Sequence, residues 1–576
     1  MDVDKAQVDP GRDSDKAGVD SDKAPTTTTA TDLDDKAPTM TTTDLDAKAL
    51  TTTTTTTTDL DVAAPTDVKT PAMAAPHSPI LKLPLEVLIR IAACLTTPEL
   101  CALRLACRAM EQLLYVTFVN EFFTRKQFMN TDNSLQALVD ISKSRLGPHL
   151  RQLHLGLDRF SDGIQRPLAD EAKERRYKQR YADFFTLWNT GANYRMLVEA
   201  LAGLRNLDEV VVRDFNSKSR TRDGPAAEWY SYGSTTIFNE TGVRLSSRLH
   251  DVWELAPGCM GNQVFSLLLH ALGAAHCRPK AIRVMARRHN ELRDYAFNIP
   301  RSAEPSVLPV LHGLEKLHLT IDLSWRSPLS GWGLVNGAPS TRSWSDELLR
   351  RFLSLTPNLR DLRINERHDY NPGLTDFLDW LADAPPAPAA AAQADRPGAT
   401  PPVALPHLES LSLGFMSVTA QPLLRVIRKF APRLRGLELW KVTLQRLLPP
   451  NSDPSDPPRD SFWADFFTKL RETPDLGIRH FKAGMLKQAY KNRPRDCVVS
   501  FKRHGLSVAY TGPCWRDFIE DVTQAIDVKW PRTVTPEQDS EGDSSVDDTD
   551  VIDGEVVLQE YLAGGFDTDG DLDSNM

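Results

Sequence analysis

The sequence lacks the features that mark membrane and secreted proteins. Its 576 residues contain no apolar run near the roughly 20 residues needed to span a bilayer. The first residues, MDVDKAQVDPGRD, are acidic and have no apolar core, so we expect no secretory signal. The seven cysteines are scattered and include no C-x-x-C pair. We therefore expect a reduced protein with buried thiols, located in the cytoplasm, the nucleus or both.

Motifs for catalysis and nucleotide binding are also missing. No G-x-x-x-x-G-K-[ST], G-x-G-x-x-G, G-x-S-x-G or H-E-x-x-H motif stands in a supporting context. Cys107 has no activating neighbour in the sequence. The net charge is −9, and the basic clusters at 173–180 and 283–293 are mixed with acidic residues, so we interpret them as solvated helix faces. We expect no enzyme activity, no cofactor and no metal site.

Both ends of the chain are of low complexity. Residues 1–76 repeat the triplet DKA and Thr-rich stretches that close in DLD, with few large aliphatic side chains. Residues 531–576 are acidic and rich in Ser and Asp. Neither segment can bury enough apolar surface to offset its ordering entropy, so we expect both to be disordered. The stretch DTDGDLDSN suggests a calcium loop, but the closing Glu is absent and we reject it.

Residues 79–125 predict two or three short, mostly apolar helices. Pro84 suits a first helical turn, and the helix over residues 85–95 has only one polar stripe, formed by Glu86 and Arg90. A helix that is apolar nearly all round must be buried on nearly all sides. About forty residues are too little chain to bury that surface alone, so part of it should face a neighbouring domain or a second protein.

A second helix in this stretch has a clear start. Thr97 can cap it, Pro98 occupies its first position, and Glu99 complements the helix dipole. Apolar residues then recur along one continuous face, at Leu100, Leu103, Cys107, Met110 and Leu114. Aromatic-rich helix should continue over residues 115–129. From periodicity alone, an ordinary core segment of a larger helical domain explains the pattern equally well.

The residues themselves carry a resemblance that decides between these interpretations. The stretch LPLEVLIRIAACLTTPELCALRLACRAMEQL resembles an F-box, whose usual pattern is LP-x-E-hydrophobic, an apolar helix, acidic-Leu, and Leu-x-x-hydrophobic-Cys-Arg. Met110 departs from the family, which usually has an aromatic residue there. The resemblance implies docking on a Skp-family adaptor and, through it, on a cullin. The adaptor-binding residues that it implies are Leu83, Pro84, Val87, Leu88, Ile91, Leu95, Leu100, Leu103, Cys107 and Met110.

The body of the chain, residues 126–530, repeats a different apolar pattern of the form L-x-x-L-x-L. The six clear copies lie at 149–157, 204–212, 311–321, 357–365, 406–414 and 432–440, and weaker copies lie at 280–286 and 478–485. The alternating end of each copy predicts a short strand with one buried face. Helices are predicted before several of them, at 193–201, 263–275, 346–355 and 423–430. Between helix and strand, Gly203, Pro357 and Pro432 end the helix.

Helix, turn and strand repeated in this way resemble leucine-rich repeats of an irregular, long kind. Such units cannot bury their apolar faces alone, so neighbours must stack into a curved parallel sheet with helices outside. We therefore predict an α/β fold class: a short N-terminal helical F-box, over residues 79–125, followed by an irregular leucine-rich-repeat solenoid with disordered tails. The alternative is a general α/β domain with coincidental matches to the pattern.

Two insertions, near 213–257 and 382–406, interrupt the predicted units. Insertions in a solenoid often carry binding function. The first insertion contains an aromatic-rich loop with Trp229, Tyr230 and Tyr232, which is our candidate for partner contact.

An F-box joined to leucine-rich repeats resembles a fungal-type substrate-recognition subunit of a Skp–cullin–F-box ubiquitin ligase. The resemblance implies that the helical stretch docks on the adaptor while the repeat surface holds a target protein. Catalysis would then work by proximity, and no residue of this chain would perform chemistry. We expect neither a membrane nor a nucleic acid among its partners. The alternative is a non-degradative leucine-rich-repeat scaffold whose F-box only holds the adaptor.

Overall fold

The structure, a computed structural model, describes part of the chain. The described residues are 78–160, 170–216, 221–224, 229–245, 260–288, 290–323, 346–366, 372–385, 400–450, 458–491 and 496–530. The chain divides into two units, Met1–Pro76 and His77–Met576, and all described residues belong to the second. The predictions of disorder for residues 1–76 and 531–576 therefore fall outside the described residues, as do parts of both insertions.

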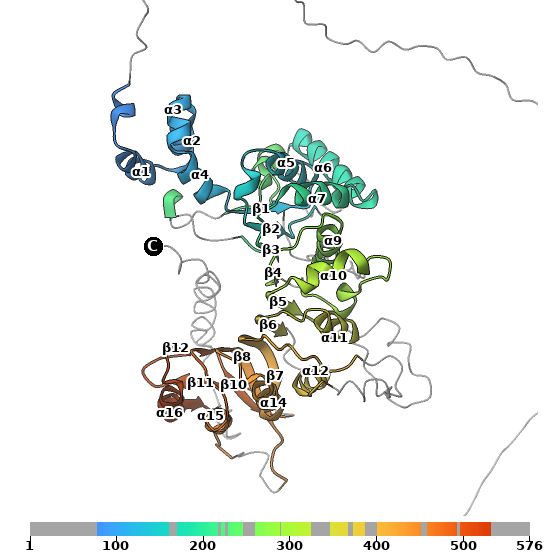
Figure 1. Ribbon diagram of the computed structural model, residues 1–576, viewed down its shortest axis with the longest axis vertical. Helices are drawn as coiled ribbons and strands as arrows, with labels where there is room; N and C mark the ends of the chain where they lie inside the picture. The colour runs from blue at the N-terminus through green and yellow to red at the C-terminus, as the bar shows by residue number, and fades with distance from the viewer. Residues whose placement is uncertain are drawn as a thin grey trace, which may run out of the picture. The chain divides into compact units, whose positions relative to one another are not determined.

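The described chain begins with a group of short helices (Figure 1). They are η1 (Pro79–Lys82), α1 (Leu85–Ala93), α2 (Thr97–Leu105), α3 (Arg108–Leu113) and α4 (Tyr115–Phe122). The start of α2 differs from the prediction by one residue, because its N-cap is Thr96 and Thr97 is already helical. The Glu99 carboxylate accepts hydrogen bonds from the backbone N–H of Thr96 at 2.9 Å and from its hydroxyl at 2.8 Å. A side chain one turn into the helix thus fixes its start.

The continuous apolar helix expected over residues 97–114 is broken at Cys107. The backbone of Cys107 is extended, with φ −161° and ψ 160°, and its Sγ accepts a hydrogen bond from the backbone N–H of Met110 at 3.4 Å. Cys107 therefore caps α3 instead of lying on an apolar face of α2. The expectation of buried thiols is also wrong for most of the described cysteines. Cys94, Cys107 and Cys514 are exposed, Cys101 and Cys277 are half-buried, and Cys497 is buried.

The helix predicted over residues 115–129 is wrong in its second half. Helix α4 ends at Phe122, and Arg125–Met129 form the strand β1. Aromatic and long side chains suit a strand as well as a helix, and here pairing with a neighbouring strand decides the conformation. Strand β1 pairs in parallel with β2 (Gln152–Gly156), which follows α5 (Asp132–Lys143) and η2 (Gly147–His149).

Thirteen strands of the described chain form one sheet, and their order follows the sequence from β1 to β8. All neighbours in this series are parallel, and β8 also pairs in parallel with both β9 and β10. The last strands pair antiparallel with their neighbours. Each of the eight copies of the repeated apolar pattern overlaps one of the strands β2 to β9 and includes its first residue. The remaining bounds are β3 (Glu209–Arg213), β4 (Ala281–Met285), β5 (Lys316–Ile321), β6 (Asp361–Glu366), β7 (Ser410–Val418), β8 (Gly436–Arg446), β9 (His480–Gly484), β10 (Lys487–Tyr490), β11 (Cys497–Phe501), β12 (Ser507–Thr511) and β13 (Ile526–Lys529).

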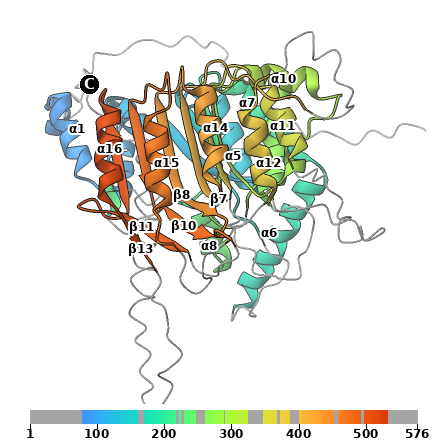
Figure 2. The same cartoon turned by 90° about the horizontal axis from the view of Figure 1, so that it is seen from below.

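Helices between successive strands lie side by side along one face of the sheet (Figures 1 and 2). The four helices predicted before strands are present as α7 (Ala192–Gly203), α9 (Met260–Ala274), α11 (Glu347–Ser354) and α14 (Ala420–Phe430). The other helices are α6 (Glu171–Asn189), η3 (Thr221–Asp223), α8 (Ser234–Thr241), η4 (Asp294–Phe297), α10 (Glu304–His312), α12 (Pro372–Ala382), α15 (Phe462–Arg471) and α16 (Trp515–Ala525). The aromatic residues Trp463, Phe466 and Phe467 are buried on α15.

The core lies between the sheet and these helices. The strand register stacks one apolar residue of each of the strands β2 to β9 into a row whose members are at most 2% exposed: Leu153, Val210, Ile282, Leu317, Leu362, Leu411, Leu437 and Phe481. Side chains alternate between the two faces of a strand, so the residues between these positions lie on the face opposite the helices. We call this opposite face the open face of the sheet.

The two basic clusters have different surroundings. Residues 173–180 lie on α6, as expected, whereas the described residues between 283 and 293 are not helical. They begin on β4, where Arg283 lies on the open face and its Nη1 donates to Oε1 of Glu209 at 3.1 Å. The side chain of Arg283 is only 13% exposed, so the interpretation of this cluster as a solvated helix face is wrong.

No helix within the described ranges is both long enough and apolar enough to cross a membrane. In the same ranges, no three His, Cys, Asp or Glu side chains lie close enough together to hold a metal ion.

Candidate functional site

Three of the residues predicted to bind an adaptor form the core of the helical group α1–α4. Leu88, Leu100 and Met110 are each 1% exposed and pack together with Ala92 and Leu114. A partner cannot reach these side chains unless the group opens. Their burial assigns them to the stability of the helices and not to a docking surface.

The other predicted residues are at least partly accessible. Val87 and Ile91 lie four residues apart on α1 and so share one side of it, whereas Leu83 precedes the helix. Each of the three is between 37% and 40% exposed. Pro84 and Cys107 are also exposed, and Leu95 and Leu103 are half-buried. The narrow polar stripe of α1 thus lies beside apolar side chains that are exposed to solvent in this chain.

Four further exposed apolar side chains lie on these helices and were not among the predicted adaptor-binding residues. They are Leu85, Leu105, Leu113 and Val116, of which Leu105 is 84% and Val116 63% exposed. Scattered apolar residues are normal on protein surfaces, but a group concentrated on a few short helices marks an interaction site. Because each fully buried aliphatic side chain stabilises a complex by about 1.5–3 kcal/mol, covering this group would strongly favour association.

The first insertion reaches back to this helical group through Arg222. The guanidinium forms a two-pronged pair with Glu121 of α4, with both hydrogen bonds at 2.6 Å. It also donates to the backbone carbonyls of Ala92 and, at 2.7 Å, of Leu95. These carbonyls lie at the C-terminal end of α1, where they have no partner within the helix and where a cation complements the dipole. Arg222 therefore joins α1 to α4.

The next residue of the insertion, Asp223, holds the other side of the same turn. Its carboxylate accepts hydrogen bonds from the backbone N–H of Thr97 at 2.7 Å and from the Thr97 hydroxyl at 2.6 Å. An anion at the N-terminus of α2 complements the dipole there, just as Arg222 does at the end of α1. We call the pair Arg222 and Asp223 the clamp. No local sequence signal indicates it, because its partners lie about a hundred residues earlier in the chain.

The aromatic loop predicted to contact a partner is mostly used inside the chain. The Trp229 ring stacks on Phe122 of α4, with 6.3 Å between ring centroids. The backbone N–H of Tyr232 donates to the carbonyl of Gln127 at 2.8 Å, which places the loop against the edge of β1. Trp229 is thus a contact within the chain, whereas Tyr230 and Tyr232 remain 40% and 44% exposed.

The open face of the sheet carries ordered polar pairs. Nη2 of Arg363, on β6, donates to Oε2 of Glu438, on β8, at 2.7 Å. The Ser412 hydroxyl, from β7 between them, donates to the same oxygen at 2.6 Å. Arg283 on β4 forms a second such pair, with Glu209 on the neighbouring strand β3. Cross-strand pairs of this kind fix the side chains and give a polar, preorganised surface.

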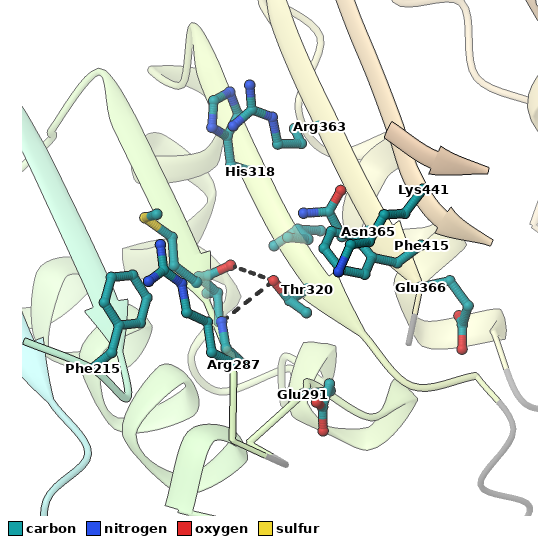
Figure 3. Close-up of a pocket in the computed structure, with 14 residues that line it drawn as sticks. Phe215, Arg287, Glu291, His318, Thr320, Arg363, Asn365, Glu366, Phe415 and Lys441 are labelled. Atoms are coloured by element: carbon teal, nitrogen blue, oxygen red, sulfur yellow. Dashed lines mark hydrogen bonds between the residues drawn. The ribbon is translucent and has the colours of Figure 1, made fainter. Parts of the chain in front are cut away.

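A cavity of about 360 Å³ lies on the open face, lined by residues of the strands β4 to β8, by Ala286 and Arg287 directly after β4, and by Phe215 and Glu291 (Figure 3). Its lining contains three half-buried cations, Arg287, Arg363 and Lys441. The carboxylates in the lining, Glu291 and Glu366, are buried.

Two of these cations lie over aromatic rings. The Arg287 guanidinium is 3.6 Å from the centroid of Phe215, and Nζ of Lys441 is 5.0 Å from the centroid of Phe415. The two pairs lie on opposite sides of the cavity, with Thr320 between them (Figure 3). Stacking on a ring holds a long side chain in place.

His318 is a buried histidine in the lining of the same cavity. It is 3% exposed, and burial lowers its pKa to about 4, although the Asp361 carboxylate, 3.1 Å from Nε2, opposes part of this shift. The ring is therefore neutral at pH 7, and the carboxylate favours the tautomer that has its proton on Nε2. Nδ1 is then a hydrogen-bond acceptor, and no partner for it exists among the residues that the structure describes.

The strands bend in register beside the cavity. Gly414, Trp440 and Gly484 pair across β7, β8 and β9, and each is followed by a residue with positive φ: Phe415 (58°), Lys441 (52°) and Met485 (54°). Non-glycine residues rarely adopt this conformation, and such strain concentrates at functional sites. The bend carries Phe415 and Lys441 into the lining of the cavity.

Comparison with known proteins agrees with one part of this description. Residues 80–115 match the family model of the F-box domain, so the matched stretch runs from η1 to the first residue of α4. The chain therefore contains an F-box domain at its helical group. Comparison with curated proteins gives no match.

Proposed function

We propose that this chain is the target-recognition subunit of a Skp–cullin–F-box ubiquitin ligase. The observation that carries the proposal is the F-box match over residues 80–115, together with the exposed apolar side chains on the same helices. The accessible residues Leu83, Val87 and Ile91 are the proposed contacts to a Skp-family adaptor. Leu88, Leu100 and Met110 form the buried core that holds these helices in place.

In this proposal, the parallel sheet and its helices are an irregular leucine-rich-repeat array that holds a target protein. Support comes from the L-x-x-L-x-L copies, each of which includes the start of a strand, and from the repeated alternation of helix and strand. The chain would supply no catalytic residue. It would act by raising the concentration of a target near a charged ubiquitin carrier.

Affinity capture with matched variants tests the proposal. The double variant Val87→Glu/Ile91→Glu places charges on exposed positions, so the chain should stay folded but lose the adaptor, because docking would bury unpaired charges. Phe185→Glu is the control, since Phe185 is 57% exposed on α6, outside the F-box. We expect a Skp-family adaptor and a cullin with the parent and with Phe185→Glu. Undiminished capture by the double variant would remove the proposal.

Proteasome inhibition separates a degradative receptor from a scaffold. A target bound by a ligase receptor should accumulate on the captured chain when degradation is blocked. Unchanged amounts of every bound protein would favour a scaffold that only holds the adaptor.

A further inference from the structure

Charged groups in the lining of the open-face cavity are engaged by the chain itself. Nη2 of Arg363 donates to Oε2 of Glu438 at 2.7 Å. The buried carboxylate of Glu366 accepts from the backbone N–H of Leu323 at 3.3 Å. An ionic ligand has to compete with such contacts, so the cavity is better suited to a neutral group.

Two aromatic rings lie on opposite sides of the cavity (Figure 3). Phe215 follows β3, and the Arg287 guanidinium is 3.6 Å from its centroid. Phe415 lies on β7 and is half-buried. Met285 of β4, also half-buried, adds a flexible thioether to the lining. Aromatic rings and thioethers make favourable contacts with a further aromatic ring, so these walls are suited to a planar apolar group.

Asn365 is a polar side chain of the lining that remains available to a ligand. It lies on β6 and is half-buried, and no hydrogen bond to its amide exists among the residues that the structure describes. A side-chain amide has both donors and an acceptor, which match the C=O and the N–H of a peptide group. Asn365 therefore offers a hydrogen-bonding partner for polypeptide backbone beside apolar walls.

The neighbouring strand is shaped to leave room for this amide. Gly414 pairs with Asn365 across β6 and β7, and a Cβ at Gly414 would lie 2.7 Å from Oδ1 of Asn365. The next residue, Phe415, has φ 58° and lies in the lining. The amide and a ring thus come from adjacent positions of the sheet. In a polypeptide ligand, a side chain and its own peptide group are adjacent in the same way.

The size of the cavity limits what it can hold. Its volume of about 360 Å³ is at the lower end of the roughly 300–1,000 Å³ typical of small-ligand sites. It can take one large side chain with the peptide group next to it, but not a folded surface.

We propose that this cavity binds one aromatic side chain of a target protein, with the adjacent peptide group hydrogen-bonded to the amide of Asn365. The proposal rests on the proposed function, since it names the chemistry by which the array would hold a target. It is nevertheless tested separately, because the lining includes no residue of the F-box.

Ligand-detected NMR titration of the full chain tests the proposal with three small probes. They are N-acetyltryptophanamide, N-acetylalaninamide and N-acetyltryptophan, which has a carboxylate in place of the terminal amide. We expect saturable binding of N-acetyltryptophanamide, at least about tenfold tighter than that of the alanine compound. Equal affinity for these two would overturn the proposal. Tighter binding of N-acetyltryptophan would also contradict it, because the site would then prefer an anion.

Matched variants locate the binding. Asn365→Leu removes the amide and keeps a branched side chain, so N-acetyltryptophanamide should bind about fivefold more weakly or worse. Phe415→Asn removes the ring at a position whose positive φ suits Asn, and it should weaken binding by about tenfold or more. Asn239→Leu is the control, since Asn239 is exposed on α8 and absent from the lining.

Unfolding curves establish which variants are folded. Parent-like binding by a folded Asn365→Leu or Phe415→Asn variant would contradict the assignment, and either variant suffices if the other does not fold. Weakened binding by the folded Asn239→Leu variant would contradict it as well.

The two proposals fail in distinguishable ways. If the parent captures the adaptor but does not prefer N-acetyltryptophanamide, only the cavity assignment is lost. If the parent binds this probe as expected and captures no adaptor, the cavity assignment stands as a site for an aromatic side chain and the ligase proposal is lost.

Discussion

The carboxylate of Asp223 holds the first residue of α2, Thr97, by two hydrogen bonds of 2.7 Å and 2.6 Å, although 126 residues separate them in the chain. Its neighbour Arg222 holds the end of α1 and the side chain of Glu121. One dipeptide of the insertion thus fixes the turn between the first two F-box helices. A segment from another part of the fold thus holds α1 and α2, with their exposed apolar side chains, in one relative orientation.

The first prediction concerns this clamp. Asp223→Ala should destabilise the helical group by about 1 kcal/mol, because the N-terminus of α2 loses an acceptor that complements its dipole. Faster amide hydrogen exchange in α1 and α2 would report the loss, while exchange in β5 and β6 stays unchanged. Asp208→Ala is a matched control, since Asp208 forms an exposed ion pair with Arg151 away from the clamp. Equal exchange in both variants would contradict the role of the clamp.

The second prediction uses two adjacent residues of α1. Leu88→Ala should cost about 2–5 kcal/mol of stability because it leaves a cavity in the core of the helical group. Val87→Ala should change stability by less than about 0.5 kcal/mol, since Val87 is 40% exposed. Chemical denaturation followed by circular dichroism measures both. Similar costs for the two variants would show that α1 is packed differently.

The third prediction concerns the approach of Trp440 to Gly484. A Cβ added to Gly484 would lie 2.3 Å from Cζ3 of the Trp440 ring, so Gly484→Ala should destabilise the sheet by about 1–3 kcal/mol through overpacking. In a Trp440→Ala background, the same substitution should cost less, because the ring is gone and only the 2.8 Å approach to Cβ of Ser507 remains. A double-mutant cycle measured by thermal unfolding gives the coupling energy. Additive costs would mean that the ring does not lie across Gly484.

The fourth prediction is a pH dependence that arises from His318. Its pKa is about 4 in the folded chain and near 6.5 when unfolded, so the unfolded state binds the proton more readily between these values. The parent should therefore lose stability relative to His318→Gln as pH falls from 6.5 towards 4, by up to about 3 kcal/mol. Asp361, Arg363 and Lys316 surround the ring and are the same in both proteins.

Comparison with His318→Gln is needed because other buried groups titrate in the same range with the opposite sign. Burial raises the pKa values of Asp158 and Asp294 to about 6, so the folded state binds protons more readily there. These two groups stabilise the fold as pH falls from 6 towards 4, and they do so in both proteins. Parallel stability curves for the parent and His318→Gln would contradict the assignment to His318.

The sequence predicted the strands of the sheet well because the signal is local. In each copy of L-x-x-L-x-L, residues such as Leu317 and Leu319 alternate along one strand and reach the core together. The break at Cys107 escaped prediction, since an apolar residue at helical spacing looks like a continuation of the helix. The strand β1 escaped prediction for a related reason, because only its pairing with β2 identifies it as a strand.

The candidate sites were predictable only in part. The F-box stretch was found from its residues, but the sequence could not separate Leu88, which is buried, from Val87, which is exposed. The clamp and the cavity depend on which strands and loops become neighbours. Arg222 contacts Glu121 only after distant parts of the chain have folded together. The same holds for Lys441 and His318, which line one cavity from different strands.

Direct binding of a purified Skp-family adaptor to the purified chain tests the central claim most directly. Calorimetry should give saturable binding with one adaptor per chain for the parent and for Phe185→Glu. Under the same conditions, the folded double variant Val87→Glu/Ile91→Glu should give none. Binding of the double variant with parental affinity, or absence of binding by the folded parent, would contradict the claim that the exposed face of these helices is an adaptor-docking surface.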